Sequence, residues 1–190
     1  MELIYRYFFP ALWLAWGAYW LAASSGVKSA VRSESQASRL LHIVPLLLAG
    51  WLLASPHARL ALLAEHWVTA SPWIFWAGAA VTLTGIGLTI WARVHLGRNW
   101  SGIVTVKDDH ELITSGPYRL VRHPIYTGLL LGFAGSALAR ANVAGLLAVA
   151  IVLWALWRKL RLEERWMTEQ FGSRYQNYSQ RVSALVPHLL

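Results

Sequence analysis

GPYRLVRHPIY, residues 116–126, is a polar and aromatic stretch with two prolines that leads directly into a long apolar run. A bilayer tolerates irregular polar backbone only where protein or a wet cavity covers it. A segment that interrupts helix, carries two arginines and adjoins an apolar run is therefore expected to form a site. The stretch indicates a membrane protein and marks where its functional residues should lie.

The composition of the whole chain is that of an integral membrane protein. Of the 190 residues, 56% are hydrophobic and only 14% are charged, which is outside the usual range of soluble domains. Many of the 12 Trp lie near the ends of apolar runs, where indole rings prefer the membrane interface. There is no Cys, so disulfides and thiolate chemistry are excluded. The net charge of +8 is attributed to membrane topology and anionic lipid, and no nucleic acid is expected as a partner.

Five apolar runs predict an all-α, polytopic membrane fold with about five transmembrane helices. The first run is too long for a signal-peptide core and lacks a basic n-region, so it is interpreted as a retained span. The second and fourth are short for a hydrocarbon core of about 30 Å, which predicts either tilted helices or, since only residues 140–142 separate the fourth run from the fifth, a tight hairpin. Residues 60–68 are expected to be an interfacial helix or an outer loop. The five runs are residues 3–23, 40–55, 72–92, 125–139 and 142–157.

Lys and Arg are distributed unevenly among the segments that connect these runs. Fourteen of the 17 lie in residues 24–39, in residues 93–124 and in the tail after residue 157. The positive-inside rule then places the N-terminus outside an inner or cell membrane and the C-terminus in the cytoplasm. Residues 93–124 and the tail are thereby predicted to share the cytoplasmic face, where the active site would lie.

Two further patterns concern helix packing and the tail. Glycines recur through the third and fourth runs, which predicts close helix packing; the alternative is that they let a bulky ligand or acyl chain approach the backbone. In the tail, apolar residues at helical spacing predict a C-terminal amphipathic helix with a break near Gly172, or equally a helix that merely lies on the membrane surface. The residues of the stripe are Met167, Phe171, Tyr175, Tyr178 and Val182.

Cationic, acidic and aromatic residues collect on the predicted cytoplasmic face, in residues 100–126 and 159–164. They include no nucleophile–base–orienter set, no phosphate-cradling loop and no GxGxxG pattern. This inventory suits a reaction that needs positioning, such as methyl transfer from S-adenosylmethionine, because the sulfonium is already activated. Aromatic faces can hold the sulfonium, the helix N-terminus at Pro124 can hold the carboxylate of the cofactor, and Glu163 can hold its ammonium or ribose.

A purely structural interpretation of the same residues is also open. Arg122 and His123 can serve as interfacial anchors, and Glu163 lies four residues after Lys159, as in an ion pair along a helix. The seven His include no two within five residues of each other, which argues against a metal site, so no metal is expected.

Motifs in residues 93–187 resemble the isoprenylcysteine carboxyl methyltransferase family, with the phospholipid methyltransferases as relatives. They occur in the family's order and spacing, and their combination is specific although each piece alone is weak. The matching motifs are Leu96-Gly97-Arg98-Asn99-Trp100-Ser101, His110-Glu111-Leu112-Ile113, Gly116-Pro117-Tyr118, Arg122-His123-Pro124-Ile125-Tyr126-Thr127-Gly128, Glu163-Glu164, Phe171-Gly172, Tyr175, Tyr178 and Arg181-Val182.

The resemblance implies a helical membrane enzyme whose cytoplasmic pocket encloses S-adenosylmethionine, while a lipidic acceptor comes from the bilayer. It implies carboxyl O-methylation of an isoprenylcysteine-like acceptor, with Lys159, Glu163 and Arg161 as candidate catalytic residues. Lys159 would face the carboxylate, with Arg158 and Arg161 adjacent, and Glu163 would touch the cofactor. The eukaryotic enzymes have Arg where this chain has Lys159, and a Lys lacks the bidentate fork, so another lipid acceptor is equally open. The implied cofactor-binding residues are His110, Glu111, Leu112, Ile113, Tyr118, His123, Pro124, Ile125, Tyr126 and Glu163.

The chain is accordingly divided into N-terminal transmembrane helices, residues 1–92, which carry no recognised motif, and a catalytic region, residues 93–190. The main rival function is an NADPH-dependent membrane enzyme resembling sterol reductases, which have a similar Arg-His-Pro-x-Tyr region. A non-enzymatic scaffold would leave the clustered polar residues without a purpose. The oligomeric state is left open.

Overall fold

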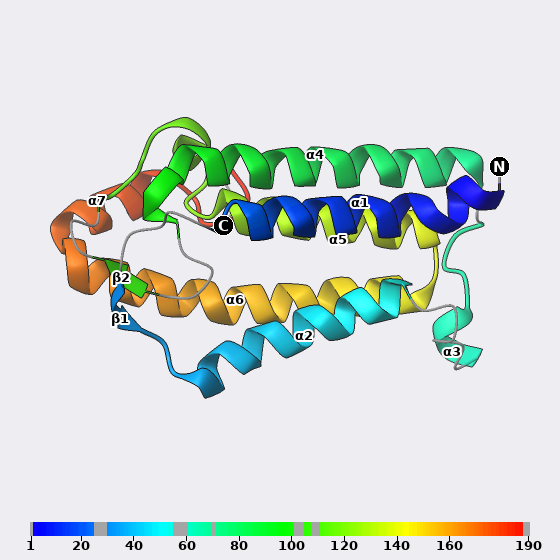
Figure 1. Ribbon diagram of the computed structural model, residues 1–190, viewed down its shortest axis with the longest axis horizontal. Helices are drawn as coiled ribbons and strands as arrows, with labels where there is room; N and C mark the ends of the chain where they lie inside the picture. The colour runs from blue at the N-terminus through cyan, green and yellow to red at the C-terminus, as the bar shows by residue number, and fades with distance from the viewer. Residues whose placement is uncertain are drawn as a thin grey trace.

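The computed structural model describes residues 2–24, 30–54, 61–69, 71–100, 105–107 and 111–187. It shows a bundle of long helices; the sheet and the turns before α5 lie at one end, and α3 with its connection to α4 lies at the other (Figure 1). The helices are α1 (Glu2–Ala22), α2 (Gln36–Ala54), α3 (Ala61–Ala64), α4 (Pro72–Leu96), α5 (Pro124–Arg140), α6 (Val143–Phe171) and α7 (Ser173–Arg181), with 3-10 turns η1 (Gly97–Asn99) and η2 (Gly116–Arg119) and strands β1 (Ala30–Ser33) and β2 (Thr105–Lys107).

Each of the five predicted apolar runs is a helix in the structure. Among the described residues, three helical segments are long and apolar enough to cross a membrane, namely α2, α4 with η1, and α6. The helices α1 and α5 stand outside that set, so the number of spans stays a prediction. The segment 60–68 contains the short helix α3, an isolated bridge from His66 to Asn142 and a bend, while residue 60 itself lies outside the described residues.

The described chain is helical as predicted, apart from one small sheet. The strands β1 and β2 pair antiparallel, with Ala30 opposite Lys107 and Ser33 opposite Thr105. Neither strand was expected, because segments of four and three residues are too short to show a periodic apolar pattern.

Glycine contacts join α4 and α5 so closely that their backbones touch. A Cβ at Gly85 would lie 2.5 Å from the carbonyl oxygen of Gly128 and 2.6 Å from the amide nitrogen of Gly132. Gly78 and Gly135 make an equivalent close contact farther along the same two helices. The prediction of close helix packing is confirmed at these positions, whereas a Cβ at Gly87 would meet nothing within 4 Å.

The predicted hairpin between α5 and α6 is also confirmed. Ala141 adopts a left-handed conformation with φ 55°, and its N–H donates to Ala137 O and Leu138 O at the end of α5. Asn142 then caps α6 by accepting a hydrogen bond from Gly145 N at 3.1 Å. Two residues therefore suffice to reverse the chain.

One continuous helix, α6, extends past the predicted membrane boundary at residue 157 as far as Phe171. Gly172, with φ 52°, ends this helix, and α7 follows. The helix is therefore interrupted where the sequence predicted an interruption. The predicted apolar stripe is thus divided between two helices: Met167 and Phe171 belong to α6, and Tyr175 and Tyr178 belong to α7. This extension carries the polar residues 158–164 to the end of the bundle where residues 116–126 lie.

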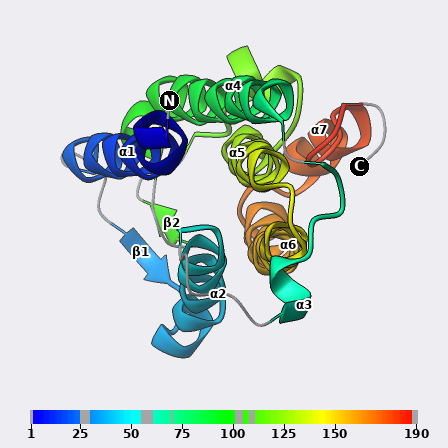
Figure 2. The same cartoon turned by 90° about the vertical axis from the view of Figure 1, so that its right-hand side faces the viewer.

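The first two helices attach on separate sides of this framework (Figure 2). On α1, the indole N–H groups of Trp13 and Trp16 donate to Ser136 Oγ on α5 at 3.1 Å and to Thr89 Oγ1 on α4 at 2.9 Å. On the other side α2 packs along α6, where Arg158 donates to the carbonyl and hydroxyl oxygens of Ser38. Both helices reach the end of the bundle that holds residues 116–126.

Candidate functional site

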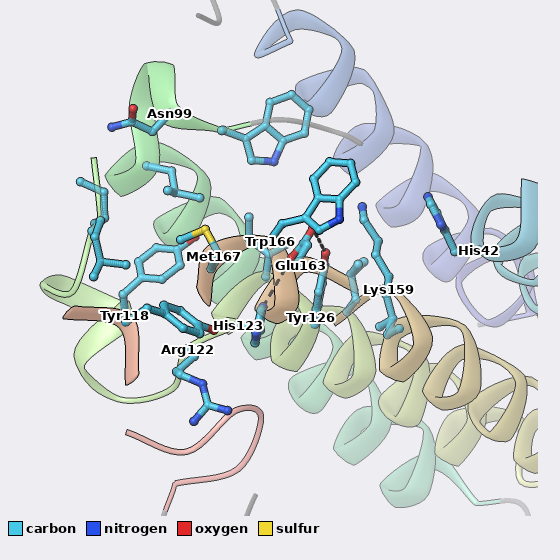
Figure 3. Close-up of a pocket in the computed structure, with 18 of the residues that line it drawn as sticks. His42, Asn99, Tyr118, Arg122, His123, Tyr126, Lys159, Glu163, Trp166 and Met167 are labelled. Carbon is cyan, nitrogen blue, oxygen red and sulfur yellow. Dashed lines mark hydrogen bonds and ion pairs between the residues drawn. The ribbon is translucent and has the colours of Figure 1, made fainter. Parts of the chain in front are cut away.

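A cavity of about 300 Å³ opens at this end of the bundle (Figure 3). Its volume is within the range of small-molecule sites. It is lined by side chains from α1, α2, the turn at residues 96–100, residues 111–113, the η2–α5 junction, α6 and α7. Elements far apart in the sequence therefore build one site.

The stretch 116–126 enters the cavity through a tight turn. Gly116 adopts φ 58°, and a Cβ there would lie 2.6 Å from the ring of His95, so both conformation and space require glycine. The side chain of His95 bonds to Ser115 Oγ at 2.9 Å, and its ring stacks on Tyr118. The turn thereby fixes the ring of Tyr118 against the cavity.

Tyr118 is held from the C-terminal side as well. The hydroxyl of Tyr178 donates to the carbonyl oxygen of Tyr118 at 2.5 Å. Burial raises the pKa of Tyr118, with a further contribution from the negative charge of Glu163, and burial raises the pKa of Tyr178 to about 12. Both phenols are therefore neutral near pH 7 and present uncharged aromatic faces to the site.

Arg122 was considered as an anchor at the membrane interface, and in the structure it is bound to other groups of the protein. Its guanidinium donates to Glu164 Oε1 at 2.5 Å and to the backbone oxygens of Ser179 and Val182 at 3.0 and 2.5 Å. Glu164 Oε1 also lies 3.2 Å from His123 Nε2. These contacts join the beginning of α5 to α6 and to the chain after α7.

The segment that follows α7 is bound to the same place through its backbone. Arg122 N donates to Ser183 O at 2.8 Å, and His123 N donates to Ala184 O at 3.0 Å. Thr127 Oγ1 donates to Leu185 O at 2.7 Å. The first turn of α5 is therefore held in position by residues 183–185.

Glu163 lines the cavity and is held by two neighbours (Figure 3). Tyr126 OH donates to Glu163 Oε1 at 2.5 Å, and His123 Nδ1 lies 3.5 Å from Glu163 Oε2. The rings of His123 and Tyr126 stack at 5.3 Å. Although burial disfavours a charged imidazole, its hydrogen bonds to the carboxylates of Glu163 and Glu164 outweigh burial and raise the pKa of His123.

Lys159 lies one turn before Glu163 on α6 and lines the same cavity. Its side chain is buried, and its ammonium lies 5.5 Å from the centroid of the Tyr126 ring, within reach of a cation–π interaction. The two other predicted basic residues face elsewhere: Arg161 is exposed and does not line the cavity, and Arg158 binds Ser38.

The structure brings most of the predicted site residues together. Pro124 is buried as the first residue of α5 without lining the cavity, Arg161 lies away from it, and His110 lies outside the described residues. The predicted residues that line the cavity are Glu111, Leu112, Ile113, Tyr118, His123, Ile125, Tyr126, Lys159 and Glu163.

The sequence did not predict the contribution of the first two helices. Trp16 and Trp20 of α1 stack at 4.9 Å, and Trp20 meets Trp100 edge to face at 5.6 Å. His42 and Leu46 complete this side of the cavity from α2. The spacing of Trp16 and Trp20 by one helical turn was the available signal, but it is equally typical of interfacial tryptophans.

The lining fits a small molecule that carries a positive charge and an aromatic ring system. Faces of Trp100 and Tyr118 suit a sulfonium or an adenine, and Glu163 suits an ammonium or ribose hydroxyls. Within the described part of the chain, no three His, Cys, Asp or Glu side chains gather as metal ligands do. The aromatic faces and the carboxylate of the cavity fit S-adenosylmethionine.

Comparison with known proteins gives a consistent family. The family model described as phospholipid methyltransferase matches residues 73–174. The chain is 30% identical over 128 residues to protein-S-isoprenylcysteine O-methyltransferase B of Arabidopsis thaliana, covering 66% of this chain and 62% of that protein. It is 31% identical to the probable protein-S-isoprenylcysteine O-methyltransferase of Oryza sativa subsp. indica, covering 67% and 65%.

A further relative, matched over a shorter stretch, and a solved structure agree with these matches. The protein-S-isoprenylcysteine O-methyltransferase of Schizosaccharomyces pombe is 33% identical over half of this chain and 42% of its own length. The fold is similar to that of the eukaryotic intramembrane Ras methyltransferase, an isoprenylcysteine carboxyl methyltransferase, with a TM-score of 0.59 and 23% identity over 84% of this chain and 55% of that one. The resemblance inferred from the motifs is confirmed, and the chain spans less than two thirds of the length of these relatives.

Proposed function

Because the chain belongs to the phospholipid methyltransferase family and is similar to isoprenylcysteine O-methyltransferases, we propose that it is an S-adenosylmethionine-dependent methyltransferase of the membrane. Its acceptor is a lipidic molecule, and the group that is methylated is the carboxylate of an isoprenylcysteine-like moiety. The observation that carries the proposal is the convergence of Glu163 and Lys159 in one aromatic-walled cavity at the end of apolar helices.

The residues of the η2–α5 junction and of α6 form the cofactor side of the site. The cofactor supplies an activated methyl group, so the protein needs to orient it and exclude water. Glu163, fixed by Tyr126 and His123, accepts hydrogen bonds from the ammonium or ribose of the cofactor. The rings of Tyr118 and Trp100 cover its sulfonium or adenine. In this proposal residues 93–190 remain the catalytic region.

Lys159 is the acceptor-binding residue on the same helix. A carboxylate is already the nucleophilic form at neutral pH, so the reaction needs no general base, and a positive charge serves to hold the acceptor in line. The ammonium of Lys159 supplies this charge inside the cavity, within a buried environment that strengthens the attraction. Arg161 is withdrawn from this role because it is exposed and outside the cavity.

The proposed orientation places this end of the bundle in the cytoplasm and the N-terminus outside. Residues 115 and 179 lie in segments that the contacts of Tyr118 and Arg122 bring to the same end of the bundle. Since the chain has no Cys, Ser115→Cys and Ser179→Cys introduce single labels. A membrane-impermeant thiol reagent should label both from the cytoplasmic side of sealed vesicles, and labelling from opposite sides would contradict the arrangement.

Cofactor binding separates the methyltransferase from the reductase. S-adenosylhomocysteine should bind the detergent-purified protein, as measured by calorimetry, and raise its unfolding midpoint. The free energy of unfolding should increase by about 2.7 kcal/mol at a hundredfold excess over Kd. NADPH should give no heat of binding in the same calorimetric titration. Binding of NADPH together with no response to millimolar S-adenosylhomocysteine would replace the proposed function with the reductase.

A further inference from the structure

His42 is a buried histidine of the cavity wall that the family match does not include. It comes from α2, outside residues 73–174, and its side chain is only 2% exposed while lining the cavity. Neither ring nitrogen has a hydrogen-bond partner among the described residues. A buried polar group of this kind costs free energy unless a ligand or another group satisfies it. The position of His42 therefore points to a group that enters the cavity.

A chain of contacts behind His42 fixes one side of the ring. Glu34 Oε1 lies 3.5 Å from His42 Nε2, and Glu34 Oε2 accepts a hydrogen bond from Ser38 Oγ at 2.7 Å. Arg158 of α6 donates in turn to Ser38 Oγ at 3.1 Å. Glu34 is itself 5% exposed and is not part of the cavity lining. Nε2 thus faces a carboxylate behind the wall, and Nδ1 is the ring nitrogen left buried without a polar partner among the described residues.

The side chain beside His42 in the cavity is the cation Lys159. Figure 3 shows the two side chains, from α2 and α6, directed toward the same part of the cavity. With Glu34 behind the imidazole, the groups presented here are a ring nitrogen and an ammonium. An anionic oxygen is attracted by both groups, whereas an ammonium head group would be repelled by Lys159. This part of the cavity therefore suits a carboxylate.

We propose that His42 is an acceptor-binding and specificity-determining residue, which donates from Nδ1 to the carboxylate of the lipidic acceptor beside Lys159. The negative charge of a bound acceptor favours the imidazolium form, in which Nε2–H faces Glu34 and Nδ1–H faces the acceptor, so Nδ1 gains a hydrogen-bond partner when the acceptor binds. The neutral methyl ester that results from methylation lacks this attraction, so the same contact favours release of the product. This inference rests on the proposed function and extends it to the first 92 residues.

The test compares an acid with its carboxamide. N-acetyl-S-farnesylcysteine and the matching carboxamide differ in charge at one position, and each is titrated into the protein saturated with S-adenosylhomocysteine. The parent should bind the acid more tightly than the amide. His42→Ala should reduce this preference by roughly tenfold or more, the size of one hydrogen bond to a charged group. Affinity for S-adenosylhomocysteine should stay within about twofold, because His42 lies away from the proposed cofactor side.

Two further substitutions distinguish a hydrogen bond from a packing role. An Asn amide nitrogen can take the place of Nδ1 and a Gln amide nitrogen that of Nε2, so His42→Asn should retain more of the acid preference than His42→Gln. His66→Gln is the matched control, since His66 is exposed and its backbone pairs with Asn142 beside the α5–α6 turn. It should leave the preference unchanged.

The outcomes separate the two proposals. An unchanged acid preference in both His42→Ala and His42→Asn overturns the role of His42 and leaves the methyltransferase intact. Failure of the parent to bind S-adenosylhomocysteine overturns the proposed function itself. If His42→Ala no longer folds, the comparison of His42→Asn with His42→Gln decides, and equal losses in these two would contradict donation from Nδ1.

Discussion

The cavity has two walls that are built in different ways. On the side of α5, α6 and α7, hydrogen bonds and ion pairs connect Arg122, His123, Tyr126, Glu163 and Glu164 into one network. On the side of α1 and α2, the wall consists mainly of aromatic and aliphatic side chains, with His42 as a buried polar member. The first wall holds its groups in fixed positions, and the second offers apolar surface.

This difference matches two ligands with different requirements. A cofactor with fixed structure benefits from a preorganised wall, because the positions of its donors and acceptors are known in advance. A lipidic acceptor needs apolar surface and a few polar groups that orient its head. We therefore assign the networked wall to the cofactor and the α1–α2 wall, together with Lys159, to the acceptor.

The largest expected effects come from removing either of two charged groups on α6, Glu163 or Lys159. Glu163→Gln should lower the affinity for S-adenosylhomocysteine by roughly 10- to 100-fold, because it removes the charge that accepts from the cofactor. Lys159→Ala should leave that affinity nearly unchanged and lower turnover roughly 100-fold, because the acceptor is no longer held in line. Calorimetry with S-adenosylhomocysteine and a methyl-transfer assay measure the two effects separately.

Arg161→Ala is the matched control for this pair, since Arg161 is on the same helix, exposed and outside the cavity. It should change neither quantity by more than about twofold. Full turnover by Lys159→Ala on an acceptor that the parent methylates would contradict the role of Lys159 in binding the acceptor.

A smaller effect, on stability alone, tests the framework behind the networked wall. Gly85→Ala should destabilise the protein by about 1–3 kcal/mol, because the new Cβ meets backbone atoms of α5. Gly87→Ala on the same helix and Gly50→Ala on α2 should be neutral or stabilising by up to about 1 kcal/mol, since nothing lies within 4 Å. Unfolding midpoints in one detergent measure all three. Equal losses would contradict the close contact of α4 with α5.

The smallest effect concerns pH and His123. The pKa of His123 is raised in the folded protein, because its contacts with Glu163 and Glu164 outweigh burial. The imidazolium therefore contributes stability that is complete below about 6.5, the unfolded value, and is lost as pH rises through the folded value. The unfolding midpoint of the parent should fall over this range, and His123→Gln should fall less steeply. A parallel pH dependence in both would contradict the ion pairs of the networked wall.

The sequence predicted the helices well because apolar runs and capping residues are local signals. The hairpin at Ala141 and Asn142, the break at Gly172 and the glycine contacts of α4 with α5 all follow from short patterns. Helix was expected beyond residue 157, at Lys159 and Glu163 and in the apolar stripe of the tail, but no local signal showed that these pieces and the fifth apolar run form one unbroken helix to Phe171. The pairing of β1 with β2 has no local signal at all.

For the site, the motifs predicted the networked wall and left the other wall unassigned. Residues such as Tyr126 and Glu163 could be placed because the resemblance covers them. His42 could not, because its importance depends on Glu34 and Ser38 behind it and Lys159 beside it, which only the tertiary fold brings together. Arg161 is near Lys159 in the sequence, but residues two apart lie on different faces of a helix, and Arg161 is exposed outside the cavity; its predicted role stays an untested prediction.

The central claim is that this cavity transfers a methyl group to the carboxylate of a lipidic acceptor. The direct measurement incubates the purified protein with methyl-labelled S-adenosylmethionine and N-acetyl-S-farnesylcysteine and then treats the lipid product with mild base. Our account predicts label in the lipid that base releases as methanol, the behaviour of a methyl ester, with little label in Lys159→Ala. Label that stays bound to a lipid amine after base treatment, or no labelling while S-adenosylhomocysteine binds normally, would contradict it.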